Sequence, residues 1–218
     1  AADQEGGHVQ RLKPAYGYEK LPEAEYLGNL DNRDTTKHYA RLMTEQLASS
    51  GVNLNLAPVL DVLNPECPPI GKLHRSFGSD ADVIVRQAGI QIDEMHRRHI
   101  LNVVKHFPGH GDTKDDTHSG YVSVNKSWDE LKACELVPFI SALDKADTIM
   151  VSHITVTSID KLPSSLSYEI ITRKLRNELG YNGVIITDSM AMGAVADSYT
   201  SDICLLYTSP SPRDPKTS

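Results

Sequence analysis

Four short segments of nearly continuous apolar character recur along the chain, and they constrain the fold more than any other feature of the sequence. Each is rich in β-branched residues and ends in polar or ionisable side chains, as expected for parallel strands buried on both faces. The segments cover residues 52–59, 101–106, 148–153 and 184–188. Every interval between them is long enough for a helical crossover, so the sequence predicts a parallel α/β fold.

Helical patterns fill the intervals between these strands. Apolar residues at helical spacing predict helices over residues 34–50, 80–99, 127–143 and 167–179, and a further helix is expected after Asp188. Ser127 and Glu130 form a capping-box pattern at the start of the third helix. Gly51 and Gly180 directly follow two of the predicted helices, where glycine commonly ends a helix.

Both a doubly wound sheet and a (β/α)8 barrel alternate strand and helix in this way. No G-x-G-x-x-G loop follows any of the four strands, which disfavours a dinucleotide-binding sheet. Polar residues collect at the carboxyl ends of the strands, where barrel enzymes carry their active sites. With a short stub at residues 1–3, the chain supplies about five of the eight strands of a barrel. We therefore expect an incomplete TIM-type barrel.

The charge balance is acidic and excludes several classes of partner. The chain of 218 residues has 22 Lys and Arg against 29 Asp and Glu, a formal net charge of −7. A nucleic-acid-binding surface needs clustered basic residues, so we expect no nucleic-acid partner. No apolar run is long enough to span a membrane. Three scattered cysteines suit neither a disulfide framework nor a cysteine zinc site.

The two ends of the chain carry separate signals. The sequence begins with Ala1 and has no initiator Met, so it indicates no compartment. The stretch from Cys204 onward has no helix or strand period, and residues 204–214 match, without interruption, the translation of a transposase-type sequencing adapter. We therefore expect residues 1–202 to form the barrel fragment and residues 203–218 to be a non-native, unstructured tail.

The segment 105–120 holds the greatest density of chemically active residues. It follows a strand directly, and its Gly and Pro residues predict a loop. A solvated polar loop explains Lys114 and Asp115, but it does not explain His106, which ends an apolar strand. A metal site is a second interpretation, with the candidate ligands His106, His110, Asp112, Asp116 and His118. Lys105 would oppose a dication there, and no H-E-x-x-H motif is present, so we expect neither metal nor cofactor.

Acid–base chemistry is the third interpretation of this loop. In an extended loop the side chains of Asp116 and His118 lie on the same side, so the carboxylate can bind and orient the imidazole. Histidine can then exchange a proton near neutral pH. Asp188, at the end of the last predicted strand, is a candidate for the same cleft, although its spacing alone favours a helix N-cap. Other strand-end candidates are Asp61, Arg75, His153, Asp3 and Arg11.

Five ordered motifs resemble those of glycoside hydrolase family 3, in its β-N-acetylhexosaminidase branch. They read D-Q-E-G-G-H-V-Q-R-L from Asp3, A-P-V-L-D-V from Ala57, R-S-F-G-S-D from Arg75, K-H-F-P-G-H-G from Lys105 followed by Asp116-Thr117-His118, and the strand ending at Asp188. This resemblance implies a (β/α)8 barrel and a retaining mechanism. Asp188 would be the nucleophile and His118, oriented by Asp116, the acid/base. The sugar would be bound by Asp3, Arg11, Arg75, Lys105 and His106.

The resemblance also implies a substrate class. The expected activity is that of a bacterial exo-β-N-acetylhexosaminidase that removes terminal non-reducing β-N-acetylglucosamine from peptidoglycan fragments or chitooligosaccharides, a small-molecule carbohydrate substrate. A β-N-acetylglucosaminide phosphorylase is one alternative, because a histidine acid/base repels a phosphate acceptor less than a carboxylate does. A metal-dependent barrel hydrolase that uses the histidine-rich loop is the other.

Overall fold

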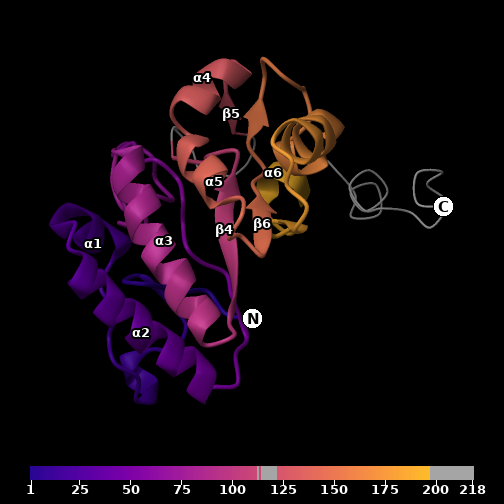
Figure 1. The fold of residues 1–218 in the computed structure, drawn as a ribbon. Helices are drawn as coiled ribbons and strands as arrows, with labels where there is room; N and C mark the ends of the chain where they lie inside the picture. The colour runs from indigo at the N-terminus through magenta and orange to yellow at the C-terminus, as the bar shows by residue number, and fades with distance from the viewer. Residues whose placement is uncertain (112, 114–121, 197–218) are drawn as a thin grey trace.

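The computed structural model describes residues 1–111, 113 and 122–196, and the chain is built around a parallel sheet (Figure 1). Its strand order is β3–β4–β6–β8. These strands are β3 (Leu54–Asn55), β4 (Leu101–Phe107), β6 (Thr148–Val151) and β8 (Val184–Thr187). All three pairings are parallel. The predicted parallel α/β architecture is therefore confirmed.

The first predicted strand is shorter than expected. Regular pairing covers only Leu54–Asn55, because Pro58 has no N–H to donate to a continuing ladder. The chain still runs beside β4 as far as Val59, which forms an isolated parallel bridge with Lys105. Ala2 forms another parallel bridge with Asn55, so the predicted stub at residues 1–3 lies next to β3.

Two of the predicted helices are confirmed almost to the residue. They are α2 (Arg33–Ser49) and α3 (Ala81–Arg97). The side chain of Asn32 accepts a hydrogen bond from a backbone N–H of the first turn of α2, and Asp80 does the same for α3. These caps satisfy N–H groups that have no partner within the helix.

The prediction of one helix over 127–143 is wrong. The structure has two short helices there, α4 (Trp128–Ala133) and α5 (Val137–Ala142), separated by Cys134 in a non-helical conformation. Pro138 lies in the first turn of α5, where a missing N–H is tolerated, whereas the interior of one long helix would not accommodate it. The predicted capping box at Ser127 and Glu130 is confirmed.

The remaining elements are short. A π-helix, η3 (Glu169–Glu178), lies within the predicted helix 167–179, and α6 (Gly193–Ala196) follows Asp188. The structure adds elements that the sequence did not predict. They are α1 (Ala24–Leu30), β1 (Gln4–Gly6), β2 (Val9–Gln10), β5 (Ser123–Val124), β7 (Thr155–Val156) and the 3₁₀ turns η1 (Pro14–Tyr16) and η2 (Ser164–Leu166). β1 pairs with β2, and β5 pairs with β7.

One continuous hydrophobic core joins the helices to the sheet. In Figure 1, α2 and α3 lie side by side next to β4, and α3 contacts both β4 and α5. Phe107 of β4 and Phe139 of α5 meet edge to face with their ring centroids 5.5 Å apart. Buried neighbours from every layer complete this core, among them Leu47, Ile92, Met95, Val104 and Ile149. This packing fixes the positions of the strand ends.

The strands differ in how well they are covered. β4 is buried from Asn102 onward, whereas β8 forms one edge of the sheet and its Val184 is 58% exposed. Among the described residues, no helix is both long and apolar enough to cross a membrane.

Candidate active site

Polar side chains from four strands gather at one end of the sheet. Asp61 follows β3, Lys105 and His106 lie at the end of β4, His153 follows β6, and Asp188 follows β8. Parallel strands end on the same side of a sheet, so side chains at these positions converge. The predicted cluster at the carboxyl ends of the strands is therefore present.

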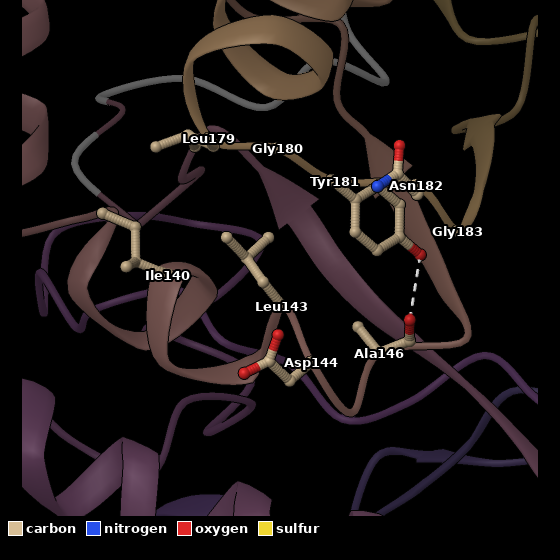
Figure 2. A pocket seen from close by; sticks show the side chains of 9 residues that line it. All are labelled: Ile140, Leu143, Asp144, Ala146, Leu179, Gly180, Tyr181, Asn182 and Gly183. Atoms are coloured by element: carbon tan, nitrogen blue, oxygen red, sulfur yellow. Dashed lines mark hydrogen bonds between the residues drawn. The ribbon is translucent and has the colours of Figure 1, made fainter.

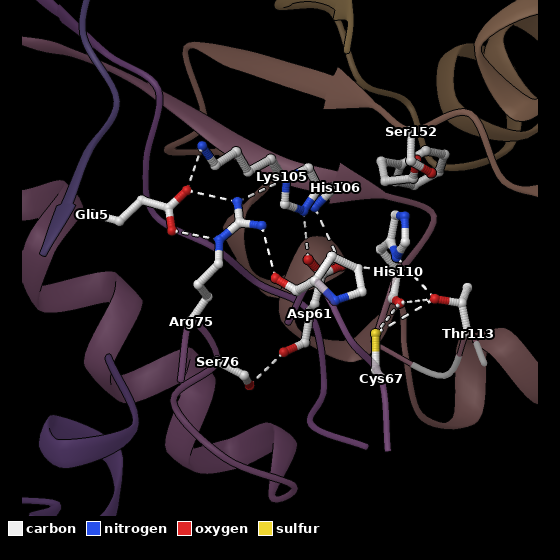
Figure 3. Close-up of polar contacts among 12 residues, drawn as sticks. Glu5, Asp61, Cys67, Arg75, Ser76, Lys105, His106, His110, Thr113 and Ser152 are labelled. Atoms are coloured by element: carbon white, nitrogen blue, oxygen red, sulfur yellow. Dashed lines mark hydrogen bonds and ion pairs between the residues drawn. The ribbon is translucent and has the colours of Figure 1, made fainter. Parts of the chain in front are cut away.

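Glu5 of β1 holds two cations at the centre of this cluster (Figure 3). Its carboxylate accepts from Arg75 Nε and Nη2, both at 2.8 Å, and lies 2.7 Å from Lys105 Nζ. Arg75 also donates from Nη1 to the carbonyl of Pro69. A two-pronged carboxylate–guanidinium contact restrains both groups in position and in plane. Glu5 thus orients two of the three predicted sugar-binding cations, Arg75 and Lys105.

The protonation state of Glu5 follows from these contacts. Burial by itself raises the pKa of the carboxyl, but the charge of Lys105 and the hydrogen bonds and charge of Arg75 outweigh it and lower the pKa to about 2. The Arg75 guanidinium is also partly desolvated, which lowers its pKa, yet Glu5 raises that pKa overall. Both partners therefore remain charged throughout the physiological pH range.

Asp3 extends the ion-pair network toward solvent. Its carboxylate accepts from Lys105 Nζ at 2.9 Å and lies 3.5 Å from Arg11 Nη2. Lys105 itself is only 2% exposed. An ammonium has three N–H donors, and Glu5 and Asp3 take two of them, so within the described residues one donor of Lys105 remains for a ligand.

His106 is held at both ring nitrogens. Nδ1 lies 2.6 Å from Asp61 Oδ2, and Nε2 lies 3.3 Å from Arg75 Nη2. Because a guanidinium only donates, Nε2 accepts and Nδ1 carries the hydrogen that is donated to Asp61. Asp61 is fully buried and also accepts from the backbone N–H of His110 at 2.7 Å. Burial raises the pKa of Asp61, but His106 and His110 outweigh it and lower that pKa.

His110 is supported by a second layer of polar contacts (Figure 3). Thr113 Oγ1 lies 3.0 Å from His110 Nδ1 and donates to the His110 carbonyl at 3.0 Å. Cys67 Sγ donates to the same carbonyl at 3.3 Å. These contacts fix the backbone just after β4 and thereby the N–H that His110 donates to Asp61.

Asp188 closes the site from the side of β8. Its backbone N–H donates to the Val151 carbonyl at 2.9 Å, and its Oδ1 accepts from the Ser189 N–H at 2.7 Å. Burial raises the pKa of Asp188, but His106, the Ser189 N–H, His153 and Lys105 outweigh it and lower the pKa. The carboxylate is therefore ionised at neutral pH. The helix that follows begins only at Gly193, so the prediction of Asp188 as a helix cap is wrong.

The predicted acid–base pair, Asp116 and His118, lies outside the described residues, as does Asp112. The residues described from the proposed metal set are therefore His106 and His110. The described part of the chain contains no group of three His, Cys, Asp or Glu residues placed to hold a metal ion. His106 also has a guanidinium at Nε2, which disfavours a dication at that atom. The described donors do not fit a metal site.

A cavity of about 490 Å³ lies at the opposite end of the sheet, beside α5 and the amino ends of β6 and β8 (Figure 2). It is lined by Ile140, Leu143, Asp144, Ala146, Leu179, Gly180, Tyr181, Asn182 and Gly183. The Tyr181 hydroxyl donates to the Ala146 carbonyl, and burial raises the pKa of this phenol. The titratable side chains of the lining are Asp144 and Tyr181, and the Tyr181 hydroxyl is directed at the Ala146 and Val184 carbonyls.

Sequence reasoning missed the central role of Glu5 and recorded Asp61 and His153 only as strand-end groups. A usable signal for Glu5 was present. Asp3 and Glu5 are two residues apart in an extended segment, so their side chains share one face. This spacing does not reveal which cations the two carboxylates bind, because Arg75 and Lys105 lie far from them in the sequence.

Together the fold and the site define a β/α-barrel protein with its polar site at the carboxyl ends of the strands. The family model for the glycosyl hydrolase family 3 N-terminal domain matches residues 1–206. The chain therefore belongs to glycosyl hydrolase family 3. The prediction of an incomplete TIM-type barrel is confirmed, since this domain has a TIM-barrel-like fold.

Individual relatives support this assignment. The beta-hexosaminidase of Tolumonas auensis is 36% identical over 205 residues, which cover 91% of this chain and 60% of that protein. The structure of a family 3 beta-N-acetylglucosaminidase from a Paenibacillus species matches with a TM-score of 0.89 and 34% identity, over 94% of this chain and 39% of the other. Beta-N-acetylhexosaminidase from Beutenbergia cavernae gives a TM-score of 0.82 and 35% identity, over 91% of this chain and 60% of the other. The chain thus spans at most three-fifths of the length of these relatives.

Proposed function

We propose that the complete protein is a retaining exo-β-N-acetylhexosaminidase that removes terminal non-reducing β-N-acetylglucosamine from peptidoglycan fragments or chitooligosaccharides. The observation that carries the proposal is the ionised Asp188 carboxylate at the end of β8, within electrostatic reach of Lys105 and His106. The hexosaminidase names of the relatives support the same activity and favour hydrolysis over phosphate transfer.

The chemistry divides into two displacements. Asp188 attacks the anomeric carbon, the glycosidic bond breaks, and His118 donates a proton to the leaving oxygen. His118, oriented by Asp116, then takes a proton from water, and that water displaces the sugar from Asp188. This assignment departs from the usual pair of carboxylates in glycosidases, because a histidine supplies the acid/base. An ionised Asp188 can attack in the first step, and His118 can serve first as the acid and then as the base.

The sugar-binding role falls to the cations and to Asp3. The hydroxyl and acetamide oxygens of the sugar can accept from Arg75 and Lys105, while Asp3 can accept from a sugar hydroxyl. Arg11, exposed beside Asp3, and His106, beside Arg75, complete the proposed set. Rigid ion pairs suit this role, since a preorganised site loses little conformational entropy on binding.

A complete barrel is part of the proposal. A barrel closes with eight strands, and the described residues contain the four strands of this sheet plus the bridge at Ala2. We propose that activity requires the residues that complete it. We also propose that residues 1–202 are the native part of the chain and that residues 203–218 are a foreign tail. Sequencing across the codons for Asp202 and Cys204 tests the tail, because an uninterrupted native reading frame would overturn it.

The test of function uses the protein expressed from the full reading frame. Incubation with an aryl β-N-acetylglucosaminide, with and without inorganic phosphate, should release free N-acetylglucosamine with retained β-configuration in early NMR spectra. Release of sugar 1-phosphate would assign the phosphorylase alternative instead. Loss of activity on treatment with a chelator would support the metal-dependent hydrolase.

A further inference from the structure

His153 is a buried imidazole that has no part in the proposed displacement or in sugar binding. It follows β6 by two residues and is 1% exposed. Both ring nitrogens have defined contacts: Nε2 lies 2.9 Å from the Ser189 carbonyl oxygen, and Nδ1 lies 2.6 Å from Ser165 Oγ. A buried histidine with two such contacts has a fixed ring orientation.

The contacts determine which nitrogen carries the hydrogen. A carbonyl oxygen only accepts, so His153 Nε2 must donate to Ser189. Ser165 Oγ, 2.6 Å from Nδ1, holds the other side of the ring. Ser165 is itself fully buried, and its backbone N–H donates to the Ser152 carbonyl at 3.1 Å. The ring therefore rests on a rigid polar frame that is built from residues after β6.

Ser189 connects this ring to the carboxylate of Asp188. Its N–H donates to Asp188 Oδ1 at 2.7 Å, and its carbonyl accepts from both His153 and the Met192 N–H, the latter at 3.0 Å. The two peptide planes that carry these groups share the Ser189 Cα atom. Holding the carbonyl therefore restricts the rotation that would turn the N–H away from Asp188.

The turn after β8 needs such a restraint. β8 is an edge strand in the described part of the sheet, Ser189 is exposed, and α6 begins only at Gly193. The described hydrogen bonds that attach this turn to β6 and the segment after it are the Asp188 N–H to Val151 and the His153 N–H to Ser189. His153 thus supplies one of these two described hydrogen bonds, beside the apolar packing of Met190 against the Leu166 cluster.

We propose that His153 is a positioning residue: by donating from Nε2 to the Ser189 carbonyl, it holds the turn that aims the Asp188 carboxylate at the anomeric carbon. With Oδ1 occupied by the Ser189 N–H, the other oxygen is the attacking atom. This inference rests on the proposed function, in which Asp188 is the nucleophile. Misplacement of a reacting group by about 1 Å can cost about 100-fold in rate, so the effect is measurable.

The test compares two amides at position 153 in the full-length protein. The Nε2 of Gln reaches the place of the imidazole Nε2 and can donate to Ser189, whereas the shorter Asn places its amide near Nδ1 and cannot. We expect His153→Gln to keep kcat within about 5-fold of wild type, and His153→Asn to lose about 100-fold in kcat at unchanged KM. The substrate is a phenyl β-N-acetylglucosaminide for which the first step limits turnover.

Several results would overturn the proposal. Equal loss in the two variants would assign His153 a purely electrostatic or packing role, and a loss confined to KM would place it in substrate binding. If His153→Asn does not fold, Ser165→Ala replaces it. That variant should lose about 10-fold in kcat at unchanged KM, and wild-type kcat would count against the proposal.

A separate measurement distinguishes this inference from the proposed function. ¹⁵N NMR of histidine-labelled protein should show His153 with its hydrogen on Nε2, and a hydrogen on Nδ1 alone would refute the positioning contact even in an active enzyme. A wild-type protein that hydrolyses no N-acetylglucosaminide would instead refute the proposed function, whatever the tautomer of His153.

Discussion

Glu5→Gln is the substitution that most directly tests how the site is held together. The side chain keeps its shape but loses its charge, so the two contacts to Arg75 and the contact to Lys105 lose their ionic partner. The NH2 group of the new amide also points its N–H donors at Arg75 and Lys105. These two side chains only donate hydrogen bonds, so the amide N–H groups would have no acceptor there. Both cations are largely buried, so water cannot replace the missing carboxylate.

The loss of the Glu5 charge has a definite energetic cost. The fall of the Glu5 pKa from 4.5 to about 2 corresponds to roughly 3 kcal/mol of folding free energy at neutral pH. Removing one partner of a buried ion pair costs about 3–5 kcal/mol. We therefore expect Glu5→Gln to lower the free energy of unfolding by about 3 kcal/mol.

The pH dependence of this effect has a definite sign. The folded-state pKa of Glu5 lies below the unfolded value, so the carboxylate stabilises the protein above pH 4.5, and this contribution disappears as the pH falls through about 2. Wild type and Glu5→Gln should therefore differ most near neutral pH and approach each other in acid.

Urea unfolding of the full-length protein at pH 7 measures the loss, and a pH series tests its sign. Glu45→Gln is the matched control, because Glu45 also accepts from an arginine at 2.8 Å but both side chains are about half exposed. Exposed pairs contribute about 0–1 kcal/mol. If Glu5→Gln cost no more than Glu45→Gln, the assignment of Glu5 as the centre of the network would be wrong.

Asp188→Asn should lower turnover at least about 1,000-fold without lowering the thermal midpoint of unfolding. In the wild-type protein, mass spectrometry after reaction with a slow fluorosugar substrate should find the covalent adduct on Asp188. An adduct on another residue would refute the nucleophile role of Asp188. Gly28→Ala should destabilise the protein by about 1–3 kcal/mol, because a Cβ there would lie 1.5 Å from the Phe77 carbonyl oxygen. Gly89 has open space around it, so Gly89→Ala should stabilise the protein by about 0.5–1 kcal/mol in the same denaturation assay. The 218-residue chain by itself should aggregate or lack hexosaminidase activity, because β8 leaves a sheet edge and Val184 uncovered; an active monomer in size-exclusion chromatography would contradict this.

The elements that the sequence predicted correctly are those encoded by local chemistry. β4 and β6 are short, apolar-rich and buried, β8 is a run of β-branched residues, and α2 and α3 begin at capping side chains. In each case neighbours in the sequence contain the whole signal. The break between α4 and α5 was also local, because Pro138 marks it, but the apolar period continued across the break and concealed it.

The ion-pair network could not be predicted in the same way. Glu5 and its partner Arg75 are 70 residues apart, and Lys105 lies 102 residues from Asp3. Any of several cations could pair with a given carboxylate at such separations, and only the packing of β1 over the end of β4 selects one. The strand-end rule indicated where polar groups gather but not which of them bind each other.

The contacts of His106 and His110 are relevant to which residue serves as the acid/base. His106 accepts at Nε2 from Arg75 and donates from Nδ1 to Asp61, so both of its ring nitrogens have a partner. His110 Nδ1 is in contact with Thr113 Oγ1. Among the described contacts, both rings therefore have a partner at Nδ1. We propose that Asp188, whose pKa is lowered, is the nucleophile and that a separate residue, His118, is the acid/base.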